Sequence, residues 1–352
     1  MIGERIKIAR QISRLNLRDL ADLVGVSHTA ISKYERGLDV PSSGVLLKLS
    51  EALNVQLDYF LRPVSVHVEE PSFRTCLSIS KKEKERILAL VQEWAERYIE
   101  AERLIFADSP PSNWISDVSP KQLSSIEEAE QVASEVREQW KLGRDPIESL
   151  TELLEDHGVK VGIFDAGEKF EACTFLVNER PVIATKNIDC GDRQNFSIAH
   201  ELGHILITAS EESLAEAITN RFAGAFIAPQ EAVVMELGNK REKISIDELA
   251  LLKHKYKLSM QGWLHRAKDL EIISDRYYEA YRKMFRDKGW DKREPREQVG
   301  SETPVRLKLL VLRAFSEGRI SESRAAELLG VSLRQFLLET SEEYAGPEKV
   351  CN

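Results

Sequence analysis

The stretch NFSIAHELGHIL, residues 195–206, places two histidines four residues apart and a glutamate directly after the first of them. Residues four apart lie on one face of an α-helix, so His200 and His204 can present both imidazole rings to a single metal ion. Glu201 projects about 100° around the helix, beside that ion, where a base must stand to take a proton from water. Gly203 leaves the metal face open to a second segment of the chain.

The next helical pattern supplies a candidate third ligand, which a catalytic zinc site requires besides one open position. Residues 213–228, SLAEAITNRFAGAFIA, are apolar nearly all round, apart from a stripe of Glu216, Thr219 and Asn220. A carboxylate on an otherwise buried helix requires compensation, so Glu216 is the candidate ligand. Thr219 and Asn220 are candidates for orienting the ligands from behind. The alternative for Glu216 is a capping box with Ser213.

The segment 17–37, LRDLADLVGVSHTAISKYERG, has the pattern of a helix-turn-helix. Ala21 is small enough for two helices to cross closely, and Gly25 tolerates the positive φ of a tight turn. Ser27 caps the second helix, whose N-terminal end would enter a major groove. The outward residues comprise the candidate base contacts His28, Thr29, Ser32 and Lys33 and the candidate phosphate contacts Arg18 and Arg36. The alternative is a helical hairpin that mediates protein contacts.

Residues 3–62 resemble the lambda-repressor/Cro-like (XRE) helix-turn-helix family, including the trailing helix Ser43–Leu53 and the LDYFL end at residues 57–61. The resemblance implies an all-α domain that binds a double-stranded DNA operator. A single domain of this kind binds weakly, so the resemblance and the geometry together imply a homodimer on two half-sites related by a two-fold axis.

The span RQNFSIAHELGHIL, followed by LAEAITNRFAGAFIAP, resembles the ImmA/IrrE family of zinc metallopeptidases. The family pattern is a HExxH helix and then a helix with a ligand glutamate three or four residues ahead of an Asn-x-Phe-Ala run that ends in proline. The resemblance covers about residues 110–290. It departs at Thr219, where the family often has alanine, and at Ala228, where it often has methionine, and neither change removes a ligand.

This resemblance implies a zinc-dependent endopeptidase in which His200, His204 and Glu216 hold Zn²⁺ and Glu201 is the general base. A donor for the tetrahedral oxyanion is also required, and the sequence does not identify it. The residues considered for that role, each more typical of a structural or surface position, are His254, Tyr256, His265 and Arg266.

The motifs divide the chain into four parts. We expect a mainly α fold of the α+β class, with an all-α first domain, a zincin-like α+β domain and a helical tail. Short apolar runs between residues 159 and 185 predict a small sheet in the second of these domains. The expected parts are a helix-turn-helix domain at 1–63, a linker and long helix at 64–109, a zinc peptidase domain at 110–290 and a helical C-terminal segment at 291–352.

Two further helical regions lie outside these motifs. The amphipathic stretch Lys81–Phe106 predicts a long helix packed on the next domain, with an arm between modules and a dimerising helix as alternatives. The segment 108–120, DSPPSNWISDVSP, ends it. Residues 320–336, ISESRAAELLGVSLRQF, repeat the helix-turn-helix pattern. Their second helix carries a single basic residue, Arg334, which favours a module packed on the peptidase domain over a second DNA reader.

Charge and composition restrict the partners and the compartment. The net charge of −9 argues against non-specific coating of nucleic acid, but residues 1–63 carry nine Lys/Arg and seven Asp/Glu, a local charge of +2. The chain has no run of eighteen apolar residues and no secretion signal, so we expect a cytoplasmic protein without a membrane anchor. Its four scattered cysteines form no CxxC pair and are expected to be reduced.

The combined expectation is a DNA-binding transcriptional regulator whose zinc endopeptidase domain cleaves a regulatory protein of the repressor or antitoxin type. The alternative is a non-proteolytic repressor or antitoxin of the XRE type, whose zinc domain only senses a ligand or a partner. The presence of Glu201 gives no sign of an inactive site.

Overall fold

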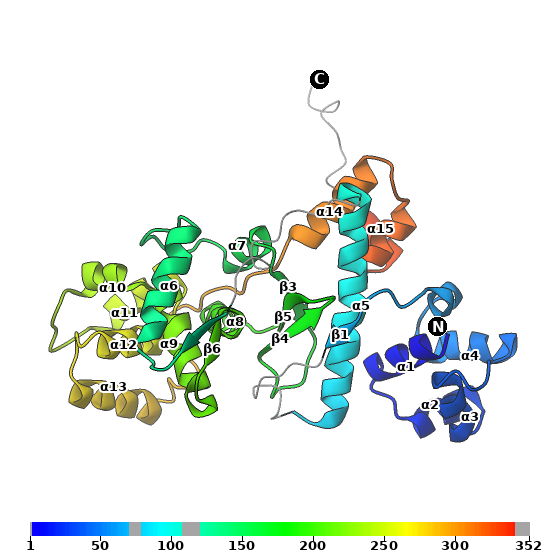
Figure 1. The fold of residues 1–352 in the computed structure, drawn as a ribbon, viewed down its shortest axis with the longest axis horizontal. Coiled ribbons are helices and arrows are strands. Elements are labelled where there is room, and N and C mark those ends of the chain that lie inside the picture. Colours follow the sequence, from blue (N-terminus) through cyan, green and yellow to red (C-terminus); the bar gives the residue numbers. More distant parts are fainter. Residues whose placement is uncertain (1, 70–78, 108–119, 342–352) are drawn as a thin grey trace, which may run out of the picture. The chain divides into compact units, whose positions relative to one another are not determined.

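The computed structural model describes residues 2–69, 79–107 and 120–341 (Figure 1). The chain divides into two compact units. Unit 1 contains residues 1–112, 175–180 and 305–352, and unit 2 contains residues 113–174 and 181–304. Most of the segment 108–120, which was expected to end the long helix, lies outside the described residues.

The N-terminal part of unit 1 is the predicted helix-turn-helix domain. Its elements are α1 (Ile2–Ile12), α2 (Leu17–Val24), α3 (His28–Glu35), α4 (Ser43–Leu53) and the 3₁₀ helix η1 (Leu57–Leu61). Asn16 forms a capping box with Asp19 at the start of α2, and Gly25 ends that helix with a φ of 75°. The Ser27 hydroxyl then accepts the Ala30 N–H and starts α3. The prediction of this motif is therefore confirmed.

The rest of unit 1 is built around one long helix, α5 (Lys81–Phe106), which has the predicted ends. Figure 1 shows α14 (Arg306–Ser316) and α15 (Glu322–Leu329) beside it, and α16 (Leu333–Ser341) follows. The buried residues of α5 and of this tail form one apolar cluster that includes Tyr98, Val311 and Phe336. The tail therefore shares its core with α5 in unit 1, and not with the peptidase domain that the sequence favoured as its packing partner. None of the described helices combines the length and apolar character that a membrane span needs.

Unit 2 contains most of a small mixed sheet, where the sequence predicted a small sheet. Its strands are β3 (Lys160–Phe164), β4 (Ala172–Val177) and β5 (Arg180–Lys186). β5 lies between the other two and pairs with β3 in parallel. The tip of the β4–β5 hairpin belongs to unit 1, where β1 (Val68–Glu69) pairs with β4 in antiparallel fashion. Cys173 is disulfide-bonded and Cys190 is free, so the expectation of reduced cysteines is wrong for Cys173.

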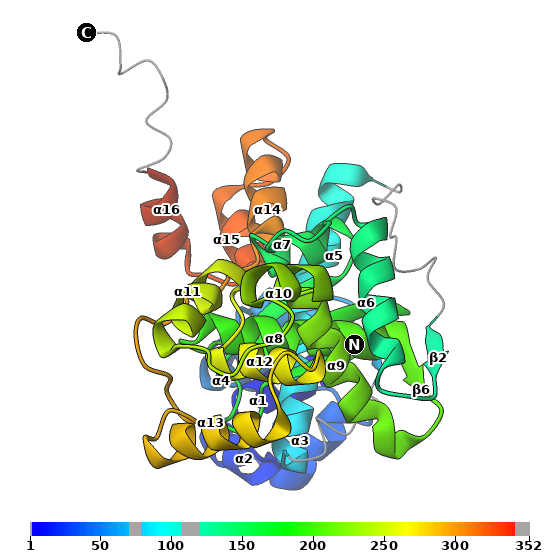
Figure 2. The same ribbon diagram turned by 90° about the vertical axis from the view of Figure 1, so that its left-hand side faces the viewer.

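Helices carry most of the core of unit 2. They are α6 (Glu128–Gln139), α7 (Leu150–Asp156), α8 (Gly191–Leu206), α9 (Ala215–Ile227), α10 (Gln230–Leu237), α11 (Ile246–Tyr256), α12 (Met260–Asp269) and α13 (Asp275–Asp287). The short strands β2 (Lys121–Leu123) and β6 (Ile207–Ala209) pair in parallel. α9 packs against both α8 and α6 (Figure 2), because nearly every face of α9 is apolar. The fold class agrees with the sequence-based expectation.

Residues 291–304, which the sequence assigned to the C-terminal segment, lie in unit 2 and brace the start of α8. The Lys253 ammonium group is fully buried and lies 3.0 Å from Glu294 Oε2 and 3.0 Å from Asp192 Oδ2. Because Asp192 is in the first turn of α8, this ion-pair network joins the helix to the 291–304 segment. A buried ammonium group with two carboxylate partners is compensated, so the network is structural.

A backbone contact at Gly191 makes this bracing testable. Gly191 starts α8, and a Cβ atom there would lie 2.0 Å from the carbonyl oxygen of Gly300. We expect Gly191→Ala to lower the free energy of unfolding by about 1–3 kcal/mol through overpacking. Urea unfolding followed by circular dichroism measures the change.

Gly300→Ala is the matched control, since a Cβ atom at Gly300 meets nothing within 4 Å. Its stability should stay within about 0.5 kcal/mol of the parent. Equal stabilities of the two variants would show that the segment does not press against the start of α8.

Candidate metal centre and DNA-binding surface

The helix predicted from residues 195–206 is the C-terminal part of α8. It carries His200 and His204 on one face, with their Nε2 atoms 3.1 Å apart. Burial lowers the pKa of both imidazoles, and for His204 the neighbouring ring adds to the effect. Both rings are therefore neutral near pH 7, which is the form that binds a metal ion.

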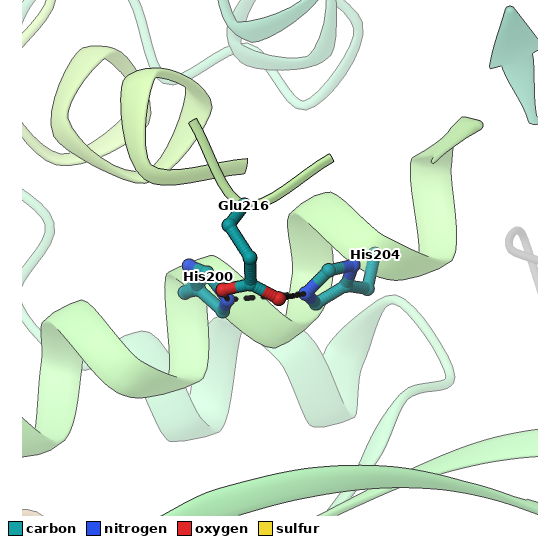
Figure 3. Close-up of side chains that lie close together, drawn as sticks. All are labelled: His200, His204 and Glu216. Atoms are coloured by element: carbon teal, nitrogen blue, oxygen red, sulfur yellow. Dashed lines mark hydrogen bonds and ion pairs between the residues drawn. The ribbon is translucent and has the colours of Figure 1, made fainter. Parts of the chain in front are cut away.

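Glu216 reaches this pair from the first turn of α9, as Figure 3 shows. Its carboxylate oxygens lie 3.5 Å from the His200 Nε2 atom and 3.6 Å from the His204 Nε2 atom. Among the described residues, these three form the cluster of metal-ligating side chains, with ligand atoms within 4.8 Å of one another. We call it the His-His-Glu cluster.

The spacing of the cluster fits a tetrahedral ion. Ligand bonds of about 2.0–2.1 Å at tetrahedral angles separate the ligand atoms by about 3.3 Å. The three measured separations, 3.1, 3.5 and 3.6 Å, lie around that value. Two imidazole nitrogens and one carboxylate oxygen are also ligands that zinc prefers, and three protein ligands leave a fourth position for water or substrate. The residues present therefore fit the metal that the sequence led us to expect.

Gly203 lets α8 and α9 approach closely enough for this geometry. A Cβ atom at Gly203 would lie 3.0 Å from the Phe222 Cδ1 atom and 3.4 Å from the Thr219 Cβ atom, both of which belong to α9. A larger residue would push α9 away from the histidine face of α8. Because Gly203 has no side chain, Glu216 on α9 lies close enough to His200 and His204 for its carboxylate to approach both rings.

The two predicted orienting residues differ in what they contact. The Asn220 Oδ1 atom lies 3.0 Å from the His200 Nδ1 atom. Because an amide oxygen only accepts, the ring donates from Nδ1 and keeps the lone pair of Nε2 for the cluster. The Thr219 hydroxyl group instead donates to main-chain carbonyls of its own helix, those of Ala215 at 2.9 Å and Glu216 at 3.2 Å.

Glu201 lies beside the cluster and is only 1% exposed. Its Oε2 atom accepts a hydrogen bond of 2.8 Å from the Thr174 hydroxyl group in β4. Burial raises the pKa of Glu201 to about 7, although the Thr174 hydrogen bond opposes the shift. Such a carboxylate can take up and release a proton near neutral pH. The sequence analysis did not identify Thr174. The feature that could have indicated it is a single hydroxyl group within the apolar run CTFLV at residues 173–177.

The four residues considered for oxyanion stabilisation have other surroundings. Tyr256, His265 and Arg266 each contact an acidic side chain outside the His-His-Glu cluster. His254 is exposed on α11. These contacts give all four a structural or surface setting.

The candidate DNA contacts lie together on the helix-turn-helix. They are Arg18, His28, Thr29, Ser32, Lys33 and Arg36. Ser32 is partly buried, and the other five residues are exposed. Ile31 of α3 is fully buried, so α3 turns its polar face to solvent. Two of the candidates also have local bonds: the Thr29 and Ser27 hydroxyl groups lie 2.8 Å apart, and Arg36 Nε donates to the Ser32 carbonyl group at 3.2 Å.

Comparison with known proteins adds two family matches. The helix-turn-helix family model matches residues 6–60, and the model of the IrrE N-terminal-like domain, a metallopeptidase family, matches residues 154–268. The second match contains the His-His-Glu cluster and Glu201.

Curated relatives match over the N-terminal part of the chain. Uncharacterized HTH-type transcriptional regulators of Rickettsia prowazekii and Rickettsia conorii are each 31% identical over 87 residues, which is 23% of this chain and 65% and 68% of the respective relative. The HTH-type transcriptional regulator ImmR of Bacillus subtilis is 37% identical over 60 residues, 17% of this chain and 47% of that regulator. The chain therefore spans between about half and two thirds of the length of these relatives. From the helix-turn-helix geometry and these matches together, we conclude that the chain belongs to the HTH-type transcriptional regulators and carries an IrrE N-terminal-like domain behind its DNA-binding motif.

Proposed function

We propose that this regulator binds a double-stranded DNA operator as a homodimer in the cytoplasm and that its second domain is a zinc-dependent endopeptidase directed at a regulatory protein. The observation that carries the enzymatic part is the convergence of the His-His-Glu cluster beside a buried glutamate, Glu201. The proposed parts are a helix-turn-helix domain at 1–63, a linker and long helix at 64–109, a peptidase domain at 110–290 and a C-terminal segment at 291–352, whose residues 291–304 brace the peptidase domain.

The roles of the side chains follow from their contacts. His200, His204 and Glu216 would hold the ion, and the chemistry that zinc supplies in such a centre is Lewis-acid polarisation of the scissile carbonyl. Glu201 accepts a proton from the attacking water and returns it to the leaving amine. The Thr174 hydroxyl group fixes the orientation of the Glu201 carboxylate.

A second candidate function is a repressor or antitoxin whose zinc domain senses a ligand or partner and cleaves nothing. One observation favours it: Glu201 is 1% exposed and bonded to Thr174, so its carboxylate does not face solvent in this structure. In this case the ion would have a structural or sensory role.

The ligand set predicts the metal content. Full-length protein should hold one equivalent of zinc, measured by elemental mass spectrometry and by competition with a chelating dye. His204→Ala and Glu216→Ala should each bind zinc more than about 100-fold more weakly, because loss of a ligand exceeds the 10–100-fold effect of an outer contact.

Glu211→Ala is the control for the metal measurement, since Glu211 is an exposed acidic residue shortly before α9. It should bind zinc as the parent does. Substoichiometric zinc in the parent, or parental affinity in Glu216→Ala, would count against the ligand set.

The general-base role of Glu201 distinguishes the enzyme from the sensor. Glu201→Gln should keep its zinc and lose cleavage of a regulator encoded beside this protein by about 10²–10⁴-fold, because the amide cannot accept the proton. Co-expression of the two proteins, followed by immunoblotting and mass spectrometry of the fragments, measures the cleavage.

Glu211→Gln controls for the charge change and should cleave as the parent does. Equal cleavage by Glu201→Gln and the parent would exclude Glu201 as the base. A parent that holds zinc, represses its operator and leaves every neighbouring regulator intact would favour the sensor.

The exposed face of α3 predicts separable effects on DNA binding. On an operator identified by chromatin immunoprecipitation, Lys33→Ala should weaken binding by about 1–3 kcal/mol and relax the preference at one base pair. Arg36→Ala should weaken binding to all sequences alike and reduce the slope of log affinity against log salt by about 1. Fluorescence anisotropy at several salt concentrations measures both effects.

Lys283→Ala, an exposed substitution on α13, is the control for lost positive charge. Should it reduce operator affinity as much as Lys33→Ala does, α3 would not be the reading element.

A further inference from the structure

A cavity of about 520 Å³ lies within unit 1. Its walls come from three places in the sequence, namely α1 and η1 of the helix-turn-helix domain, α5, and α15 with its C-terminal cap. Pockets of this size accept small organic ligands. Since other parts of the helix-turn-helix domain (Arg5, Val55 and Tyr59) and the tail both border it, a ligand here would contact the DNA-binding domain and the tail simultaneously.

Most charged groups in the cavity wall already have partners. Arg5 pairs with Glu96 at 2.7 Å, and Arg324 pairs with both Glu100 and Glu327. Glu327 also contacts Arg62, and Glu93 accepts a hydrogen bond of 3.3 Å from the Tyr59 hydroxyl group. The acidic side chains of the wall are therefore engaged by groups of the protein.

Two arginines of the wall lack such a partner among the described residues: Arg103, which is exposed, and Arg97, which is partly buried. Arg97 lies in α5 among these pairs, yet no carboxylate of the described residues forms an ion pair with it within 4.0 Å. Its hydrogen bond runs from Nε to the Glu93 carbonyl group of its own helix, at 3.4 Å. Burial lowers the pKa of Arg97, and the charge of Glu93 only partly opposes this effect.

The guanidinium group of Arg97 lies against the cap of α15. A Cβ atom at Gly330 would be 1.9 Å from the Arg97 Nη1 atom and 3.2 Å from its Nη2 atom. A side chain at residue 330 would therefore displace the guanidinium group from its present position. Five donors in a planar fork match the two oxygens of a carboxylate or phosphate group, and a guanidinium group without a counter-ion is costly to bury.

We propose that this cavity binds a small organic anion whose phosphate or carboxylate group pairs with Arg97. The apolar parts of the wall, Val55, Tyr59 and Leu328, would contact the body of the ligand. Because α1 and η1 belong to the DNA-binding domain, the bound anion would change the stability of that domain's contacts with α5 and α15. The site is an effector site, and it does not depend on the zinc centre.

Isothermal titration calorimetry on the full-length protein in phosphate-free buffer tests the site. The probes are inorganic phosphate, adenosine 5′-monophosphate and succinate, so that the phosphate and carboxylate classes are distinguished. At least one probe should bind with a stoichiometry of one per chain. Arg97→Gln should weaken that binding at least about tenfold, and Arg97→Lys, which keeps the charge without the fork, should give an intermediate affinity.

Two controls separate binding from folding. Arg282→Gln, on the exposed face of α13, should bind the probe as the parent does. Without a probe, Arg97→Gln should unfold at no lower a temperature than the parent, because it removes a partly buried charge that lacks a counter-ion. The probe should raise the unfolding temperature of the parent and not that of Arg97→Gln.

Three results would overturn the proposal. They are the absence of binding of all three probes up to roughly 10 mM, equal affinity of the parent and Arg97→Gln, and a large loss of stability in Arg97→Gln without a probe, which would mark Arg97 as a structural residue.

Discussion

The close approach of α8 and α9 at Gly203 is the constraint on which the candidate metal centre depends. Two histidines on one helix can share an ion by themselves, but a catalytic site requires a third ligand from another element. Phe222 and Thr219 lie against Gly203, and this contact holds the start of α9 over the histidine face. Glu216 then reaches both imidazoles with a short side chain that is still 48% exposed. Glu216 is therefore held in place as a candidate ligand while the cluster stays open to solvent on its side.

Buried ion-pair networks keep those two helices in place. Glu130 of α6 contacts Arg221 of α9 and Arg266 of α12, and Arg221 also contacts Asp269. These ion pairs hold the middle of α9 at Arg221, while the Lys253 network holds the start of α8. Because each buried charge has a partner of opposite sign, the networks specify the arrangement of the helices without leaving an unpaired charge.

The sequence predicted what depends on local periodicity. The helix-turn-helix follows from the spacing of apolar residues and from its caps. The ends of α5 and the helices that carry His200 and Glu216 follow from the spacing of apolar residues alone. The contact of Asn220 with His200 was also predictable, because both helices were known and one polar stripe remained. The hydrogen bond from Thr174 to Glu201 was not predictable, because Glu201 lies 27 residues away on another element. A threonine in a strand is also too common to indicate such a role. The core of the tail with α5 joins segments some two hundred residues apart, which no local pattern reports.

The buried Arg137 and the partly buried Arg97 differ in how their donors are used, and this difference distinguishes a structural arginine from a candidate binding residue. Arg137 donates to the carbonyl groups of Gly143, Phe226 and Asp145 at 2.6–2.8 Å, so the fold itself supplies its acceptors. Arg97 has one long bond to its own helix and faces a cavity. Water can fill such a space, but water does not neutralise the charge, whereas an anion does both. The same reasoning applies to the His-His-Glu cluster, where three lone-pair donors converge from two helices and a cation between them is the group that they favour together.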